Sequence, residues 1–240
     1  MKIRHVLAVL AATTALFAGA PAPAGARAPH TGDTFRRAPV TESLSQCSAE
    51  FLDGDKRLGP LRLPVLGVVG QELQYYHRTG RLSSQRFLEL YWNPVAGPNG
   101  GWYYPPQSGY VLNPDGSPKR VEETLQVGQD IDRYGSEYGS FLAPEGLPYA
   151  ERSIPPASLD STPPEACNYH DYRVLKPFTV YAGPIAPWFE QPGLGRQYQL
   201  DPSLVPDAPT QGYNVQWLVD NGYLERIIPH RAPAAVPNQR

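Results

Sequence analysis

The sequence lacks the short motifs that mark the common hydrolase and nucleotide-binding folds. It contains no G-x-S-x-G nucleophile motif, no H-E-x-x-H zinc motif, no phosphate-binding P-loop and no G-x-G-x-x-G after a predicted strand. Histidine is also scarce, with only His30, His77, His170 and His230 after the first 26 residues. A single histidine in a predicted strand is more often structural than catalytic. The sequence therefore disfavours serine hydrolases and zinc enzymes.

Cysteine is limited to Cys47 and Cys167. Two cysteines without a nearby histidine pattern make a poor zinc site. In an oxidising compartment the favoured interpretation is one intramolecular disulfide, Cys47–Cys167, which would stabilise the fold by about 4–5 kcal/mol in the chain-entropy model. Two unpaired buried thiols or an intermolecular bridge remain as alternatives.

Long apolar runs are absent after the N-terminus. The one run, Val6 to Ala20, follows Lys2 and Arg4 and is too short to span a bilayer, which needs about 20 residues. The small residues Ala24-Gly25-Ala26 complete the pattern of a secretory signal peptide over residues 1–26. We therefore expect a secreted, extracellular protein that is not held at a membrane once the signal peptide is removed.

Basic residues are in slight deficit. Without the signal peptide the chain has 19 lysines and arginines against 23 acidic residues, whereas a nucleic-acid binder would be basic. This balance argues against nucleic acid as a partner but leaves room for a local basic pocket. Beyond the signal peptide we expect a flexible linker over 27–46, an aromatic, turn-rich N-terminal extension over 47–123, a domain over 124–228 and a flexible tail over 229–240.

Proline and glycine are abundant instead, with 28 and 22 residues spread throughout the chain. This excludes long helical bundles and solenoids. Short helices are predicted at Ser84–Tyr91, with Ser83 or Ser84 as N-cap, and within Val215–Glu225, where Asn221-Gly222 stops the helix. Alternation of polar and apolar residues over Tyr169–Gly183 predicts strands on both sides of Pro177, which would lie at an edge or a bulge. The expected fold class is α+β, compact, strand-dominated and loop-rich.

The stretch Asp132–Pro144 concentrates glycines, aromatic side chains and charges. Its glycines would let the backbone approach a ligand closely. Arg133, and Arg152 further along the chain, would each offer a planar fork of donors to a phosphate. The alternative interpretation is a surface turn whose arginines form ordinary salt bridges.

Further loop residues add rings and amides to this set. Tyr134 or Trp188 would stack on a ring, and Gln191 or Gln197 would bind hydroxyl groups through the side-chain amide. With two arginines for a pyrophosphate, these groups suit a nucleotide. Side chains of these types bind a ligand more readily than they act as nucleophiles. Trp188 is an equally good candidate for a position in the hydrophobic core.

Several motifs occur in an order that resembles the tuberculosis necrotizing toxin domain family. They are Asp132-Arg133-Tyr134-Gly135, Phe141-Leu142-Ala143-Pro144, Pro148 to Pro156, Tyr172-Arg173-Val174, Gly183 to Gly193 and Asn221 to Glu225. The resemblance covers about residues 124–226. The segment before it, with Cys47, Asp55 to Pro60 and Trp102-Tyr103-Tyr104-Pro105, resembles the exported fungal surface NAD glycohydrolases that carry this domain.

The resemblance implies an enzyme that hydrolyses NAD⁺ to nicotinamide and ADP-ribose, with a toxin among the roles in the family, in an α+β domain distantly like the ADP-ribosyltransferases. Arg133 and Tyr134 match the family's arginine–aromatic pair, and Arg152 matches its second arginine. Gln197 matches the family's glutamine, and His170 a histidine of the toxin branch. The expected catalytic residues are Gln197, Arg152 and His170, and the expected substrate-binding residues are Arg133, Tyr134, Phe141, Trp188 and Gln191.

Cleavage of NAD⁺ would need little acid–base chemistry, because the cationic nicotinamide leaves as a neutral molecule. Under this hypothesis the two arginines hold the pyrophosphate, an aromatic side chain packs on the nicotinamide, and Gln197 orients the ribose or the attacking water. A carboxylate from Glu137 or Glu190 is a candidate to stabilise the oxocarbenium-like centre.

Two other functions remain open: an exported nucleotide-binding module without turnover, and an ADP-ribosyltransferase with the same pocket. No cofactor is expected, because NAD is the substrate. Calcium, which fungal relatives are thought to bind, is left open but has no support in the sequence, because Asp207 or Asp220 alone does not supply enough oxygen ligands. A homodimer and an immunity protein are further expectations from the resemblance.

Overall fold

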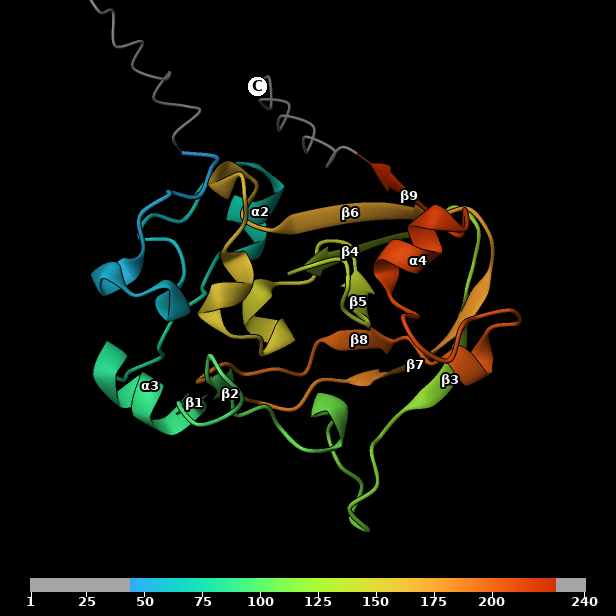
Figure 1. The fold of residues 1–240 in the computed structure, drawn as a ribbon, viewed down its shortest axis with the longest axis horizontal. Helices are drawn as coiled ribbons and strands as arrows, with labels where there is room; N and C mark the ends of the chain where they lie inside the picture. Colours follow the sequence, from blue (N-terminus) through green and yellow to red (C-terminus); the bar gives the residue numbers. More distant parts are fainter. Residues whose placement is uncertain (1–43, 228–240) are drawn as a thin grey trace, which may run out of the picture. The chain divides into compact units, whose positions relative to one another are not determined.

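The computed structural model describes residues 44–227. The predicted signal peptide, most of the predicted linker and the predicted tail lie outside these residues. A seven-stranded antiparallel sheet with the strand order β3-β7-β8-β5-β4-β6-β9 organises the described chain. Its strands are β3 (Val121–Leu125), β4 (Asp130–Tyr134), β5 (Phe141–Pro144), β6 (Tyr169–Val174), β7 (Phe178–Pro184), β8 (Arg196–Gln199) and β9 (Leu224–Ile227). Short β5 joins β4 to β8 and so links the two halves of the sheet (Figure 1).

Strands form on both sides of Pro177, as the alternating pattern predicts. β6 and β7 bury alternate side chains in the core, among them Tyr172 and Val180. The two strands do not pair with each other, since β6 lies between β4 and β9 while β7 lies between β3 and β8. Pro177 lies in the connection rather than at an edge or a bulge. There its missing N–H removes no hydrogen bond from the sheet.

The helices are short. They are α2 (Gly67–Glu72), α3 (Ser84–Tyr91) and α4 (Val215–Asp220). Ser83 is the N-cap of α3, because its hydroxyl accepts a hydrogen bond from the N–H of Arg86 at 3.2 Å. α4 ends at Asp220 with Asn221 as its C-cap, at the stop predicted near Asn221-Gly222, and Tyr223–Glu225 are not helical. Gly222 adopts a left-handed φ of 67°, which ends the helix, and β9 begins two residues later.

The connections contain a two-stranded ribbon and several 3₁₀ turns. The ribbon pairs β1 (Trp92–Asn93) with β2 (Gly101–Trp102). The turns are η1 (Leu52–Gly54), η2 (Lys56–Leu58), η3 (Gln107–Gly109), η4 (Tyr149–Arg152), η5 (Pro156–Leu159), η6 (Pro164–Ala166) and η7 (Pro202–Leu204). Within residues 44–227 no helix has the length and apolar character that a membrane crossing requires. The strand-dominated α+β class is thus confirmed.

The disulfide Cys47–Cys167 is present, as expected, and closes a loop of 120 residues. Both cysteines are buried in a hydrophobic cluster with Leu73, Tyr134 and Tyr149. Leu73 comes from the N-terminal extension, whereas Tyr134 and Tyr149 come from the later domain. The covalent link and the shared cluster therefore hold the extension against the domain.

A second contact between the extension and the later domain is aromatic. Phe189 is fully buried and packs against Phe87 and Trp102, with ring centroids 6.4 and 5.5 Å apart. Trp188 lies at the edge of this cluster, where its indole N–H donates to the carbonyl of Tyr103 at 2.6 Å. The aromatic segment around Trp102 thus packs as a structural element, and Phe189 rather than Trp188 occupies the core.

Candidate active site

A cavity of about 610 Å³ lies between the N-terminal extension and the later domain. One side is formed by residues of the extension, including Trp102 and Ser108, and the other by Arg133, Phe141 and Gln197. This space is called the first cavity below. A smaller recess of about 70 Å³ is lined by the same three domain residues and by residues of β4 and β5, among them Leu142.

The glycine loop after β4 is built around the guanidinium of Arg133. Nε donates to the carbonyl of Ser136 at 2.7 Å, and Nη1 donates to the carbonyl of Phe141 at 2.6 Å. A Cβ at Gly139 would overlap Nη2, so only glycine leaves room for this side chain. The loop therefore holds the Arg133 side chain in place and is more than an ordinary surface turn. It is called the clamp around Arg133 below.

Arg133 brings an unneutralised positive charge to the first cavity. Its hydrogen-bond acceptors are backbone carbonyls, and it forms no ion pair with a carboxylate of residues 44–227. Burial lowers the pKa of Arg133 from its ordinary value, but an arginine remains charged at neutral pH. A partly desolvated cation of this kind suits an anionic ligand.

Arg152 also lines the first cavity, but carboxylates surround it. The guanidinium forms a bidentate pair with Asp132, at 2.5 and 2.7 Å, and a third contact with Glu72 at 3.0 Å. The carbonyl of Leu147 accepts two further hydrogen bonds. The Arg152 side chain is only 5% exposed. These contacts place Arg152 in the structural support of the cavity wall, and its predicted contact with a pyrophosphate stays a prediction.

Glu72 is the acidic residue of this network that the sequence did not reveal. It comes from α2 in the extension, and its Oε1 has no hydrogen-bond partner among the described residues. Desolvation raises the pKa of Glu72 to about 8, more than the charge of Arg152 lowers it. At neutral pH Arg152 is therefore balanced mainly by Asp132. A glutamate in a short apolar helix carries no sequence signal for such a role.

Gln197 extends from β8 into the first cavity. Its Nε2 donates to the carbonyl of Ser108 at 2.9 Å, which holds the amide against the extension. The side chain is buried and lies next to Gly109, another residue of the cavity wall. The amide is thus fixed in orientation, as a group that positions a reactant must be.

Tyr134 and Phe141 complete the predicted residues that the structure brings together in the first cavity. Tyr134 is largely buried, with its ring centroid 4.9 Å from that of Tyr149 and 5.1 Å from that of Tyr169. It therefore supports the wall more than it presents a free ring. Phe141 is less buried and offers more of its ring to a ligand.

Three predicted residues lie outside the lining of the first cavity. Trp188 belongs to the aromatic cluster, and Gln191 donates to the carbonyl of His77 at 2.7 Å. His170 lines a neighbouring space of about 680 Å³, called the second cavity below. Burial lowers the pKa of His170, more than nearby Glu137 raises it. The predicted binding and catalytic roles of these three residues stay predictions.

No Asp, Glu or His lines the first cavity within the described chain. Of the two carboxylate candidates, Glu137 lines the second cavity and pairs with Arg226 at 2.7 Å. Glu190 accepts a hydrogen bond from Tyr91 at 2.9 Å. In residues 44–227 no three side chains of the types that bind metals gather around a common point. The first cavity is thus suited to binding and orientation rather than to proton transfer by a carboxylate.

Comparisons with known proteins agree with the motif analysis. Residues 124–227 match the family model described as tuberculosis necrotizing toxin. The chain is 46% identical, over 180 residues, to the conidial surface nicotinamide adenine dinucleotide glycohydrolase of Aspergillus fumigatus. The matched region covers 74% of this chain and 71% of the Aspergillus protein. A solved structure of tuberculosis necrotizing toxin with its immunity factor matches 78% of this chain and 94% of its own, with a TM-score of 0.48 and 19% identity. This chain belongs to the tuberculosis necrotizing toxin family.

Proposed function

We propose that this protein is an NAD⁺ glycohydrolase, which cleaves the bond between nicotinamide and ribose and releases nicotinamide and ADP-ribose. The observation that carries the proposal is the 46% identity to a conidial surface NAD glycohydrolase over 180 residues, which is longer than the family match over residues 124–227. The first cavity offers the groups that this reaction needs, with Arg133 for a phosphate and Gln197 for the ribose or the water.

The chemistry explains why a cavity without carboxylates is sufficient. Nicotinamide in NAD⁺ is a cationic leaving group that departs neutral, so no general acid has to protonate it. The residues can act by holding the ribose and the water in a reactive orientation and by excluding solvent. Gln197, fixed by its hydrogen bond to Ser108, is the polar group best placed to do this.

Export to the cell surface or the medium is part of the proposal. It rests on the signal-peptide pattern of residues 1–26 and on the surface location stated for the Aspergillus relative. A toxic role and an immunity protein are proposed from the necrotizing toxin, whose structure contains its immunity factor. A homodimer stays a prediction from the sequence.

The test is incubation of the purified protein with NAD⁺, with separation of the products by chromatography. We expect nicotinamide and ADP-ribose in equal amounts over many turnovers, without an added acceptor protein. Binding of NAD⁺ without release of nicotinamide would identify a nucleotide-binding module instead. Release that requires an acceptor protein, and labels it, would identify an ADP-ribosyltransferase.

Gly139→Ala is expected to raise KM for NAD⁺ by about tenfold or more, the effect of losing a charge-assisted hydrogen bond of about 1.5–3 kcal/mol. The added methyl group would displace the guanidinium of Arg133. Because the Arg133 side chain is flexible, it can move aside without unfolding the protein. Steady-state kinetics and a thermal melt measure both effects.

A double variant makes this test specific. If Gly139→Ala acts through Arg133, it should add little to the effect of Arg133→Met. Gly116→Ala is the control for KM, because nothing lies within 4 Å of a Cβ at that glycine and it does not line the first cavity. Its left-handed φ of 83° makes alanine lower the stability there, so the control should change the thermal melt but not KM. Additive effects of Gly139→Ala and Arg133→Met would contradict the clamp.

A further inference from the structure

The second cavity adjoins the first. Trp102, Ser136, Ala157 and Asn168 line both spaces, so the two cavities meet at these residues. Each space has a volume typical of a cavity for a small organic ligand. NAD⁺ consists of two nucleotides joined through a pyrophosphate, and the two halves match two adjoining cavities.

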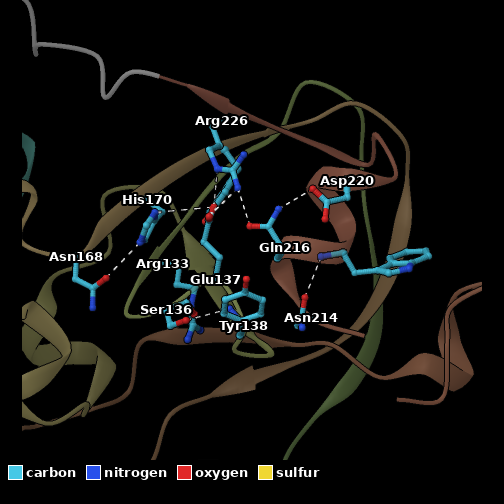
Figure 2. Close-up of polar contacts among 12 residues, drawn as sticks. Arg133, Ser136, Glu137, Tyr138, Asn168, His170, Asn214, Gln216, Asp220 and Arg226 are labelled. Atoms are coloured by element: carbon cyan, nitrogen blue, oxygen red, sulfur yellow. Dashed lines mark hydrogen bonds and ion pairs between the residues drawn. The ribbon is translucent and has the colours of Figure 1, made fainter. Parts of the chain in front are cut away.

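One wall of the second cavity is held by a chain of polar contacts (Figure 2). Asn168 and His170 lie 3.4 Å apart, and His170 lies 3.9 Å from Glu137. Arg226 then joins Glu137 to Gln216 through hydrogen bonds of 2.7 to 2.9 Å. The wall is therefore ordered, and the charge of Glu137 is neutralised by Arg226.

Lys56, another residue that lines the second cavity, suits a phosphate. Lys56 is exposed and forms no ion pair with the described residues, whereas the neighbouring Arg57 is paired with Asp55. Asp160 lines the same cavity, and its buried Oδ1 accepts no hydrogen bond from the described residues. Burial raises the pKa of Asp160 to about 7, which weakens its repulsion of an anion at neutral pH. Lys56 is thus an unpaired cation in this space, next to an aspartate whose negative charge is weakened by burial.

Tyr138 supplies an aromatic face. Its side chain is 76% exposed, lines the second cavity and makes no ring contact with the described aromatic residues. Trp92, in contrast, already contacts Trp102 and the guanidinium of Arg57. Stacking of a base on an exposed aromatic ring is favourable and tolerant of base identity.

We propose that the second cavity binds the adenosine half of the dinucleotide, with Lys56 at the phosphate and Tyr138 stacked on the adenine. This inference rests on the proposed function, because the nicotinamide half then occupies the first cavity. It also assigns His170 to the adenosine side of the substrate rather than to the bond that breaks.

Calorimetric titration with AMP tests the proposal without depending on turnover. AMP should bind the wild-type protein, and Lys56→Glu and Tyr138→Ala should each weaken binding about tenfold. The matched controls Lys119→Glu and Tyr75→Ala change exposed residues outside both cavities and should leave AMP binding unchanged. Absence of AMP binding to the wild-type protein, or wild-type affinity in both cavity variants, would overturn the proposal. So would a loss of AMP affinity in Gln197→Ala, since that residue belongs to the first cavity.

Kinetics with a truncated substrate separate this inference from the proposed function. Lys56→Glu should raise KM for NAD⁺ about tenfold and leave kcat/KM for nicotinamide mononucleotide, which lacks the adenosine half, unchanged. An equal loss of kcat/KM with NAD⁺ and with nicotinamide mononucleotide would contradict the assignment of the second cavity to the adenosine half. If the wild-type protein releases no nicotinamide from either substrate, the proposed function fails, and the AMP titration alone decides what the second cavity binds.

Discussion

Arg152→Met is expected to lower the free energy of unfolding by about 3–5 kcal/mol, the cost of removing one partner from a buried ion pair. Methionine has a similar length but no charge, so Asp132 is left without its bidentate partner in a site from which water is excluded. Glu72 loses the guanidinium at the same time. Because this network joins α2 of the extension to β4, the wall of the first cavity should loosen as well.

Urea denaturation followed by fluorescence measures this effect. The control is Arg173→Met, which removes the more exposed pair with Asp130 and should cost less than about 1 kcal/mol. The experiment also separates the two roles of Arg152. Wild-type stability with a loss of NAD⁺ cleavage would show a substrate contact and contradict the structural role.

Gln197→Ala is expected to reduce kcat by about 10²- to 10³-fold, comparable to the loss of one preorganised polar group at a reacting centre. Among residues 44–227 no carboxylate lines the first cavity and could replace the amide, and the hydrogen bond to Ser108 fixes the orientation of the amide. Nicotinamide release at saturating NAD⁺ is the measurement, with a thermal melt to establish that the variant is folded.

Gln199→Ala is the matched control for Gln197→Ala. The two glutamines lie on the same strand, but Gln199 contacts Arg120 and the hydroxyl of Ser108 and does not line the first cavity. Its turnover should remain near that of the wild type. Wild-type kcat in Gln197→Ala would remove this residue from the mechanism.

The features that the sequence predicted correctly are local or covalent. Ser83 as N-cap, strands on both sides of Pro177, and the Cys47–Cys167 disulfide each follow from residue type and short-range pattern. The helix predicted within Val215–Glu225 ends where Asn221-Gly222 indicated, and Gly222 has the left-handed φ that closes it. The strand that follows was not predicted, because β9 forms by pairing with β6, which is distant in the sequence.

The residue types of the site could likewise be predicted from the sequence, but their positions in the fold could not. Arg133, Phe141 and Gln197 were singled out by type and motif, and the structure places them around one cavity. Trp188 and Gln191 have equally suitable chemistry, yet contacts with the extension place them elsewhere. Whether an aromatic or amide side chain faces a ligand or a neighbouring segment depends on packing between distant parts of the chain.

The sequence by itself determined the family, the strand-dominated class, the disulfide and the chemical character of a nucleotide site, because these depend on residue types and their order. Only the tertiary structure decided which charges remain available. Arg133 and Arg152 are the same residue type in neighbouring motifs, but Arg133 is held by backbone carbonyls, whereas Asp132 neutralises Arg152 and Glu72 accepts a further hydrogen bond from it. Glu72 reaches Arg152 across 80 residues of sequence, and such a contact exists only once the chain has folded.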